Sequence, residues 1–325
     1  MESATLAGST YANPVWSGYM ADPYALRVGD IYYAYGTGAP DPGTGRRFPV
    51  LRSRDFAHWE YVGGALEPLA YRPLNADYWA PAVAEKDGLF YLYYSSAPRE
   101  DVLAHRLRVA VADSPEGPFR DAGRDLLPGE GFTIDADPFR DPRDGRWYLF
   151  YARDFLDGPR AGTGLAVVPL ADDLMTVAGE PRPVVRATDD WQIYERGRSL
   201  YGKVWDAWHT LEGASVVARG GRYWCFYSGG RWETEDYGVS CVVADHPLGP
   251  WNPIGHGPVV LRAAPERGIL GPGHNSVVVG PDGRTDYMVY HAWDAAKTAR
   301  RMCLDRLIWT PDGPRCDGPS TGGRL

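Results

Sequence analysis

The segment GRYWCFY at residues 221–227 decides the fold, because its pattern returns four more times along the chain. In each copy a glycine is followed by an aromatic-rich run that ends on tyrosine, which predicts a tight turn leading into a β-strand. The other copies are GDIYYAY at 29–35, GLFYLYY at 88–94, GRWYLFY at 145–151 and GRTDYMVY at 283–290, the last with one extra residue. Successive glycines lie 59, 57, 76 and 62 residues apart, and such a period indicates a repeat architecture.

Strand-like segments flank every copy of the repeat. A short apolar segment precedes each glycine, as in ADPYALRV at 21–28, and another strand-like run follows, as in GVSCVVAD at 238–245. A final strand often comes after a Gly-Pro turn, as in GPWNPIG at 249–255. Four short antiparallel strands per repeat are typical of propeller blades. The sequence therefore predicts one all-β domain over 1–325, a five-bladed β-propeller with four antiparallel strands per blade. A β-sandwich, the alternative, does not explain a period of roughly 60 residues.

The repeats also set the expected boundaries of the blades. These are 15–67, 75–128, 131–186, 205–262 and 270–320. An insertion at about 187–204 shows no clear strand alternation and predicts a long loop. Long loops in compact domains are often functional, and a plain surface excursion is the alternative. Whether an N-terminal strand completes the fifth blade is left open.

Composition supports this fold and limits the function. The 325 residues include 39 glycines and 28 prolines, so long helices have almost no place. The formal charge of −8 argues against a nucleic-acid partner, and no apolar run reaches the roughly 20 residues of a membrane span. The first residues show no basic segment followed by an apolar one. As it stands, the sequence predicts a cytoplasmic protein, or a secreted one from which a leader has been removed.

Equivalent positions in the repeats carry the residues that point to chemistry. The first strand of each blade lines the central axis of a propeller, so residues at one end of these strands converge. The converging positions are Asp22, the pair Trp79–Ala80, Asp135, Glu212 and His274. Three carboxylates in one place raise at least one pKa, which suits general acid–base catalysis. A turn or cap role for Asp22 and Asp135 is the alternative.

The motifs around these positions resemble glycoside hydrolase family 43. They are ADP at 21–23, WAP at 79–81, ID at 134–135 with F-x-D-x-x-D-G at 139–145, LEG at 211–213 and GPGHNS at 271–276. Each motif alone is weak, but their order and register are specific, and the resemblance runs from about Gly18 to Trp309. It implies a five-bladed propeller whose active site lies on the central axis, and an inverting glycosidase with an oligosaccharide or polysaccharide as substrate.

The resemblance also implies roles for the three carboxylates. Asp22 matches the general base that activates water, and Glu212 matches the general acid. Asp135 matches the third carboxylate, which orients the acid and tunes its pKa. Asp137 is the rival for that role, because ADP at 136–138 echoes the first motif. The sequence departs from the family pattern at Ala214, where proline often follows Glu-Gly.

Further residues are expected to contact the substrate or an ion. The expected substrate-binding residues are Trp79, His209, His274, His291 and Arg301, with Arg300 as the alternative to Arg301. The resemblance places the equivalent of His274 near a central ion, frequently Ca²⁺, which prefers oxygen ligands and would meet the imidazole through water or one bond. No organic cofactor is expected. For each of these residues a plain structural role is the alternative.

The resemblance leads us to expect activity on pentose-containing plant saccharides, by an α-L-arabinofuranosidase or an exo- or endo-arabinanase. No β-sandwich follows Trp309, and that module accompanies many xylosidases of the family. A β-D-xylosidase and a galactan-directed glycosidase remain alternatives on the same scaffold. A non-catalytic sugar-binding propeller would not need three carboxylates. A phosphorylase would need a cationic phosphate pocket, and fructan enzymes usually begin with W-x-N-D-P, whereas this chain reads YMADP.

Overall fold

The computed structural model describes residues 9–69 and 76–325 and confirms the five-bladed β-propeller. Residues 1–8, where the N-terminal segment judged for a leader begins, and residues 70–75, the last of which starts the expected second blade, lie outside the described residues. Within the described part, the only helices are the single 3-10 turns η1 (Val102–Ala104), η2 (Asp190–Gln192) and η3 (Pro265–Arg267). No helix there is long and apolar enough to cross a membrane.

Each blade contains four strands in chain order, paired antiparallel. Blade one comprises β2 (Ala21–Val28), β3 (Ile31–Thr37), β4 (Arg47–Ser53) and β5 (Glu60–Leu66). Blade two comprises β6 (Ala76–Lys86), β7 (Leu89–Pro98), β8 (Arg106–Ala112) and β9 (Arg120–Asp125). Blade three comprises β10 (Thr133–Arg140), β11 (Trp147–Phe155), β12 (Gly162–Pro169) and β13 (Arg182–Val185). Blade four comprises β15 (Lys203–Arg219), β16 (Arg222–Gly229), β17 (Gly238–Ala244) and β18 (Asn252–Pro253). Blade five comprises β19 (Leu270–Val279), β20 (Asp286–Trp293), β21 (Arg300–Thr310) and β22 (Gly313–Cys316).

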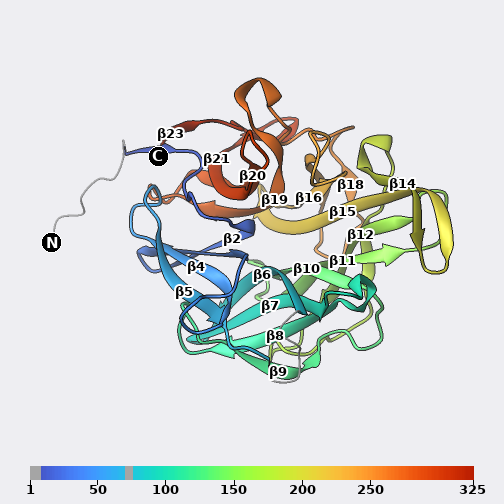
Figure 1. Ribbon diagram of the computed structural model, residues 1–325, viewed down its shortest axis with the longest axis horizontal. Helices are drawn as coiled ribbons and strands as arrows, with labels where there is room; N and C mark the ends of the chain where they lie inside the picture. Colours follow the sequence, from blue (N-terminus) through green and yellow to red (C-terminus); the bar gives the residue numbers. More distant parts are fainter. Residues whose placement is uncertain (1–8, 70–75) are drawn as a thin grey trace.

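The five inner strands β2, β6, β10, β15 and β19 surround the axis. Each contacts the next, and β19 contacts β2, so the ring is closed (Figure 1). The repeated aromatic strands pack between blades: Tyr93 and Tyr151 are fully buried in one cluster shared by blades two and three. Burying such large rings removes much apolar surface from water, which is the main stabilising term in folding.

Ring closure at the termini differs from a strand added to blade five. β1 (Thr10–Ala12) pairs with β23 (Gly322–Arg324) in a separate two-stranded sheet. The connection to blade one then follows β21, where the Val15 and Met20 amides donate to the carbonyls of Met302 and Arg300. The N-terminal segment therefore fastens the first and last blades without becoming a strand of either.

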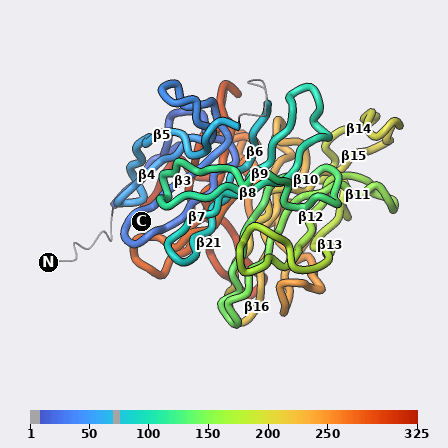
Figure 2. The backbone as a smooth tube through the Cα atoms, turned by 90° about the horizontal axis from the view of Figure 1, so that it is seen from below, coloured from blue at the N-terminus to red at the C-terminus, as the bar shows by residue number. Residues whose placement is uncertain are grey.

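The prediction of a long loop at 187–204 is wrong. These residues contain η2 and the strand β14 (Ile193–Leu200), which pairs antiparallel with the first part of β15. Tyr201 and Gly202 join the two strands and both have positive φ, 54° and 72°, as a two-residue hairpin turn requires. The hairpin projects from the ring beside blades three and four (Figures 1 and 2). Alternation was hard to detect because β14 has little buried surface of its own.

Every inner strand carries a bulge at the same register. The residues Asp22, Ala80, Asp135, Gly213 and His274 have φ between 46° and 61°, and strand pairing shifts there in all five blades. A bulge leaves its extra residue outside the ladder and redirects the side chains around it. The five bulges therefore place their side chains together at one end of the axis.

Candidate active site

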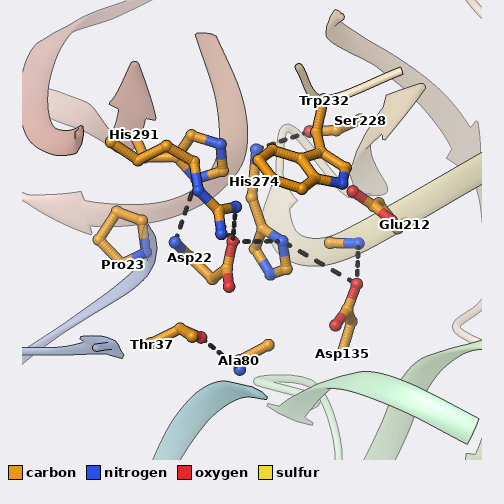
Figure 3. A network of polar contacts seen from close by, with 12 residues as sticks. Asp22, Pro23, Thr37, Ala80, Asp135, Glu212, Ser228, Trp232, His274 and His291 are labelled. Carbon is orange, nitrogen blue, oxygen red and sulfur yellow. Dashed lines mark hydrogen bonds and ion pairs between the residues drawn. The ribbon is translucent and has the colours of Figure 1, made fainter. Parts of the chain in front are cut away.

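The three predicted carboxylates meet in one cavity on the axis. Asp22 of blade one, Asp135 of blade three and Glu212 of blade four line a cavity of about 310 Å³. Figure 3 shows His274 between Asp22 and Asp135. The remaining lining residues are Thr37, Trp79, Ile134, Tyr194, Trp232, His274 and Arg300.

The inner-strand bulges determine which residues reach this cavity. Asp22, Asp135 and His274 occupy the left-handed position itself, with φ of 52°, 56° and 48°. Non-glycine residues rarely adopt this conformation, and such strain is characteristic of functional sites. The sequence alignment of the repeats is one residue off in blade four, because Gly213 holds the bulge position and Glu212 precedes it. Glu212 is thus the equivalent of Trp79, and Gly213 is the equivalent of Asp22.

Asp22 is surrounded by groups that favour its ionised form. Arg300 Nη1 lies 3.2 Å and His274 Nδ1 3.3 Å from Asp22 Oδ1. Burial opposes ionisation, but these neighbours, Arg300 first, outweigh it and hold the pKa of Asp22 well below its usual value. Arg300 carries most of this effect near neutral pH, because burial lowers the pKa of both histidines beside Asp22. The pKa of His274 is lowered, and that of His291 falls to about 4.

His291 supports Asp22 from behind. Its Nδ1 accepts a hydrogen bond from the Asp22 backbone amide at 3.1 Å and lies 3.4 Å from Asp22 Oδ1. The ring is fully buried and does not line the axial cavity. The geometry therefore does not meet the prediction that His291 binds substrate, and it places the ring as a support for Asp22.

Glu212 and Asp135 have raised pKa values, in contrast to the lowered pKa of Asp22. Burial raises the pKa of Glu212 to about 7, against a hydrogen bond of 2.7 Å that Tyr237 Oη donates to Oε1. Burial, followed by the charges of Glu212 and Asp22, raises the pKa of Asp135 well above its usual value. Asp135 Oδ2 accepts from the Gly213 amide at 3.1 Å and so fixes the backbone next to Glu212. An ionised Asp22 in one cavity with carboxyl groups whose pKa values are raised is an arrangement suited to acid–base catalysis.

Asp137, the rival of Asp135, does not line the cavity. It is buried farther along β10, where its Oδ2 accepts from the Val216 amide at 2.8 Å. Burial raises its pKa to about 7. The two residues are separated because the bulge at Asp135 turns the strand between them. The geometry therefore favours Asp135 as the third carboxylate of the site.

A second cavity of about 150 Å³ adjoins the first. The two share the lining residues Trp79, Ile134, Tyr194, Glu212 and Trp232. Trp208, Leu200 and Arg198, from the hairpin of β14 and β15, line only the second cavity, and Asp22 and Asp135 are absent from its lining. Glu212 therefore lines both cavities, whereas Asp22 lines only one.

Trp79 and His274 lie where the sequence predicts them, at the cavity wall. Trp79 lines both cavities, and one face of its ring is stacked on His105 with centroids 3.7 Å apart. The side chain of His274 is 13 % exposed and contacts both Asp22 and Asp135. Two further predictions differ from the structure.

Arg301 and His209 point away from the site. Arg301 forms an ion pair with Asp294 at 3.1 Å and lines a different cavity. Successive residues of β21 face opposite sides, so the alternative Arg300 is the one that reaches Asp22. His209 is buried, with Nδ1 3.1 Å from the Ala161 carbonyl and Nε2 3.1 Å from Arg160, and it lines neither cavity.

Several residues of the site escaped the sequence analysis. Trp232 lies in the loop between β16 and β17, stacks on Trp293 with centroids 5.6 Å apart and covers the Arg300 guanidinium at 4.4 Å. Thr37 Oγ1 accepts from the Ala80 amide at 2.8 Å and joins blades one and two at the cavity. No motif marks these positions, although a tryptophan in a loop between strands is a signal that could have been followed.

The described residues around His274 do not form a set of side-chain ligands for the expected ion. Among residues 9–69 and 76–325 there is no group of three or more His, Cys, Asp or Glu side chains that could hold a metal. His274 Nδ1 faces the carboxylates of Asp22 and Asp135. Ca²⁺ takes six to eight oxygen ligands, so these side chains do not fit a directly coordinated ion. An ion held through water stays a prediction, and no step below depends on it.

Comparison with known proteins agrees with the geometry of the site. Residues 11–314 match the model of glycosyl hydrolases family 43. The beta-D-galactofuranosidase xynD of Aspergillus niger is 29 % identical over 95 % of this chain and 86 % of its own length. An extracellular exo-alpha-(1->5)-L-arabinofuranosidase of Streptomyces avermitilis is 25 % identical over 94 % of this chain and 62 % of its own.

Solved structures show the same relation. The crystal structure of a thermostable family-43 glycoside hydrolase superposes with a TM-score of 0.82 at 31 % identity, covering 96 % of this chain and 97 % of that one. A structure described as an endo-1,4-beta-xylanase from Bacteroides thetaiotaomicron gives a TM-score of 0.75 at 28 % identity, covering 98 % and 99 %. With the family match over nearly the whole length and three carboxylates in one axial cavity, the chain belongs to glycosyl hydrolases family 43 and is an enzyme that hydrolyses O-glycosyl bonds.

Proposed function

We propose that this enzyme is an inverting furanosidase that acts on α-L-arabinofuranosides, from oligosaccharides or arabinan. The observation that carries the proposal is the pair Asp22 and Glu212, which line one cavity with pKa values moved in opposite directions. The names of two relatives that align with most of this chain support a furanose ring as substrate. α-L-Arabinofuranosides and β-D-galactofuranosides share their ring configuration and differ by one hydroxymethyl group. The β-D-galactofuranoside is therefore the second candidate substrate.

In the proposed reaction the sugar to be released occupies the cavity that holds both acid and base. Asp22 accepts a proton from a water molecule while the oxygen of that water bonds to the anomeric carbon. Glu212 donates its proton to the glycosidic oxygen as the bond to the leaving group breaks. The configuration at the anomeric carbon inverts, because water attacks from the face opposite the leaving group. Asp22 then returns its proton to solvent, and Glu212 takes one up.

The second cavity is suited to the leaving group. It contains the acid Glu212 but not the base Asp22, as the leaving-group side of a scissile bond requires. Its volume of about 150 Å³ matches a single sugar ring more closely than a chain. Aromatic walls from Trp208 and Tyr194 offer the apolar surface on which sugar rings stack. The arrangement favours release of terminal residues over cleavage inside a chain.

The test is hydrolysis of aryl α-L-arabinofuranoside, β-D-galactofuranoside and β-D-xylopyranoside, beside linear arabinan and xylo-oligosaccharides, with and without phosphate. We expect arabinose release that does not depend on phosphate. Turnover of the xyloside alone would replace the proposal by a xylosidase with the same carboxylates. Strict dependence on phosphate would indicate a phosphorylase. Sugar binding by calorimetry without any turnover would indicate a binding protein.

A further inference from the structure

Tyr237 lies directly behind the acid and is not part of the cavity lining. Its side chain is 1 % exposed, and its hydroxyl donates to Glu212 Oε1 at 2.7 Å. Among the residues that the structure describes, no group forms a hydrogen bond with the other carboxyl oxygen, Oε2. Glu212 therefore has one oxygen held from behind and one that is left for the substrate.

A chain of hydrogen bonds sets the direction of the Tyr237 proton. The His274 amide donates to Ser228 Oγ at 2.7 Å, which leaves the Ser228 hydroxyl to donate elsewhere. Burial raises the pKa of Tyr237 well above its usual value, and a hydrogen bond with the Ser228 side chain opposes this rise. Tyr237 has a single hydroxyl proton, and that proton points to Glu212 Oε1. The His274 amide thus occupies one acceptor position of Ser228 Oγ, and Glu212 Oε1 accepts the single hydroxyl proton of Tyr237.

The motif GPGHNS accommodates this tyrosine. A side chain at Gly273 would place its Cβ 2.3 Å from Tyr237 Cε1 and 2.9 Å from Ser228 Oγ. The ring of Tyr237 also stacks parallel to His291, with centroids 6.0 Å apart at 9°. The tyrosine is thus packed between the strand that carries the acid and the histidine that supports the base, and it has little freedom to turn.

We propose that Tyr237 is a positioning residue that keeps the catalytic proton of Glu212 on Oε2, the oxygen that can reach the glycosidic bond. The reasoning follows from donor and acceptor roles: the carbonyl oxygen of a carboxylic acid is the better acceptor, so a hydrogen bond from Tyr237 to Oε1 favours the acid proton on Oε2. The proposal rests on the proposed role of Glu212 as the general acid. It assigns to the buried tyrosine and to Gly273 a purpose beyond packing.

The test is Tyr237→Phe, which removes the hydroxyl and keeps the ring. We expect turnover of an unactivated disaccharide or of arabino-oligosaccharides to fall about tenfold, because the acid proton is then shared between both oxygens and the carboxyl group is less well held. An aryl glycoside with a dinitrophenol leaving group needs little protonation, so its hydrolysis should change much less. This difference between leaving groups is not expected from a merely structural role.

The pH profile provides a second readout. The hydrogen bond from Tyr237 lowers the pKa of Glu212, so its removal raises that pKa. The acid works only when protonated, and the basic limb of the kcat/KM profile should therefore move to higher pH. The other charged groups that act on Glu212 are Asp22 on β2, Arg300 on β21 and Glu233 in the loop after β16, and Glu212 itself acts on Asp135 on β10. The substitution removes none of them.

Tyr290→Phe is the matched control. Tyr290 is also a buried tyrosine that donates to a carboxylate, Asp305 Oδ2, at 2.7 Å, but it lies outside the axial cavity. It should change neither the leaving-group dependence nor the pH profile. Equal losses of activity on both substrates in Tyr237→Phe, with an unmoved basic limb, would overturn the proposal. A Tyr237→Phe variant with the activity and pH profile of the wild type would overturn it as well.

Ser228→Ala keeps the proposal testable if Tyr237→Phe does not fold. It frees the tyrosine hydroxyl to rotate and should move both readouts in the same direction by a smaller amount. Unchanged readouts in a folded Ser228→Ala variant would contradict the chain of hydrogen bonds. Failure of the proposed function itself would look different, because the wild-type enzyme would then release no sugar from any glycoside of the panel.

Discussion

Asp22 and Glu212 show how neighbours give two buried carboxyl groups different tasks. Both are close to the same axis, but Arg300 faces Asp22, and a neutral tyrosine faces Glu212. A fixed positive charge favours the ionised form, whereas burial without one favours the protonated form. The rate should therefore follow a bell-shaped pH profile, in which Glu212, with its pKa of about 7, sets the basic limb.

Arg300→Met should move the acidic limb of that profile. Loss of the guanidinium raises the pKa of Asp22, and the base works only when ionised. The acidic limb of the profile should therefore move to higher pH. We expect the acidic limb to move up by about one pH unit or more, and one pKa unit corresponds to ~1.4 kcal/mol of interaction with the ionised form. The neighbouring substitution Arg301→Met is the control, because Arg301 pairs with Asp294 outside the cavity. An unmoved acidic limb in Arg300→Met would show that Asp22 does not depend on this arginine.

The arginines also mark what sequence reasoning can decide at this scale. The three carboxylates were predictable because each follows a motif at a repeated position. The choice between Arg300 and Arg301 depends on which face of β21 meets the axis, and neither motif nor composition contains that information. His209 and His291 failed as substrate contacts for the same reason, since a histidine near the axis can equally well be a buried support.

The hairpin of β14 and β15 is the element that gives this propeller its second cavity. Arg198 of β14 lies over the rings of Tyr194 at 4.5 Å and Trp208 at 5.8 Å, and all three line that cavity. The stacked guanidinium is held in place by these rings and can donate to sugar hydroxyls. The hairpin thus contributes residues to the cavity that Asp22 does not line.

Arg198→Ala should affect the leaving-group side only. We expect KM for arabino-oligosaccharides to rise several-fold, whereas KM for a small aryl α-L-arabinofuranoside changes less than twofold. Ser199→Ala, on the exposed side of the same strand, is the control. Steady-state kinetics of the three proteins on both substrates decide the question. Equal effects of Arg198→Ala on both substrates would argue against a leaving-group site at the hairpin.

The blades were predictable and the hairpin was not, for one physical reason. Blade strands such as β3 and β7 bury aromatic residues in the core, and burial leaves a regular pattern in the sequence. β14 is held by hydrogen bonds to β15 and has no buried residue, so its sequence carries no comparable pattern. The bulges were likewise invisible, which explains the displacement of Glu212 by one residue.

At the scale of the whole molecule, a buried carboxylate joins the two ends of the chain. Asp305 of β21 accepts from Tyr11 Oη at 3.1 Å, Tyr290 Oη at 2.7 Å and the Ser320 amide at 3.0 Å. Tyr11 belongs to β1 and Ser320 precedes β23, so one side chain connects the first and last segments of the ring. The site takes Asp22 from the first blade and His274 and Arg300 from the last, so it needs this closure.

Asp305→Ala should destabilise the ring without altering the chemistry. Loss of the acceptor leaves two buried tyrosine hydroxyls and an amide without a partner, and we expect the free energy of unfolding to drop by about 3 kcal/mol. Urea titration followed by tryptophan fluorescence measures this change. Well below the melting temperature kcat should stay near that of the wild type. A variant as stable as the wild type would show that the closure lies elsewhere.

The stereochemistry of the first product tests the central claim most directly. Proton NMR during hydrolysis of an aryl α-L-arabinofuranoside by the wild-type enzyme resolves the two anomers before they interconvert. A base at Asp22 that activates water, opposite an acid at Glu212, predicts that β-L-arabinose forms first. The α anomer as the first product would contradict the account, because retention requires a carboxylate that attacks the sugar itself.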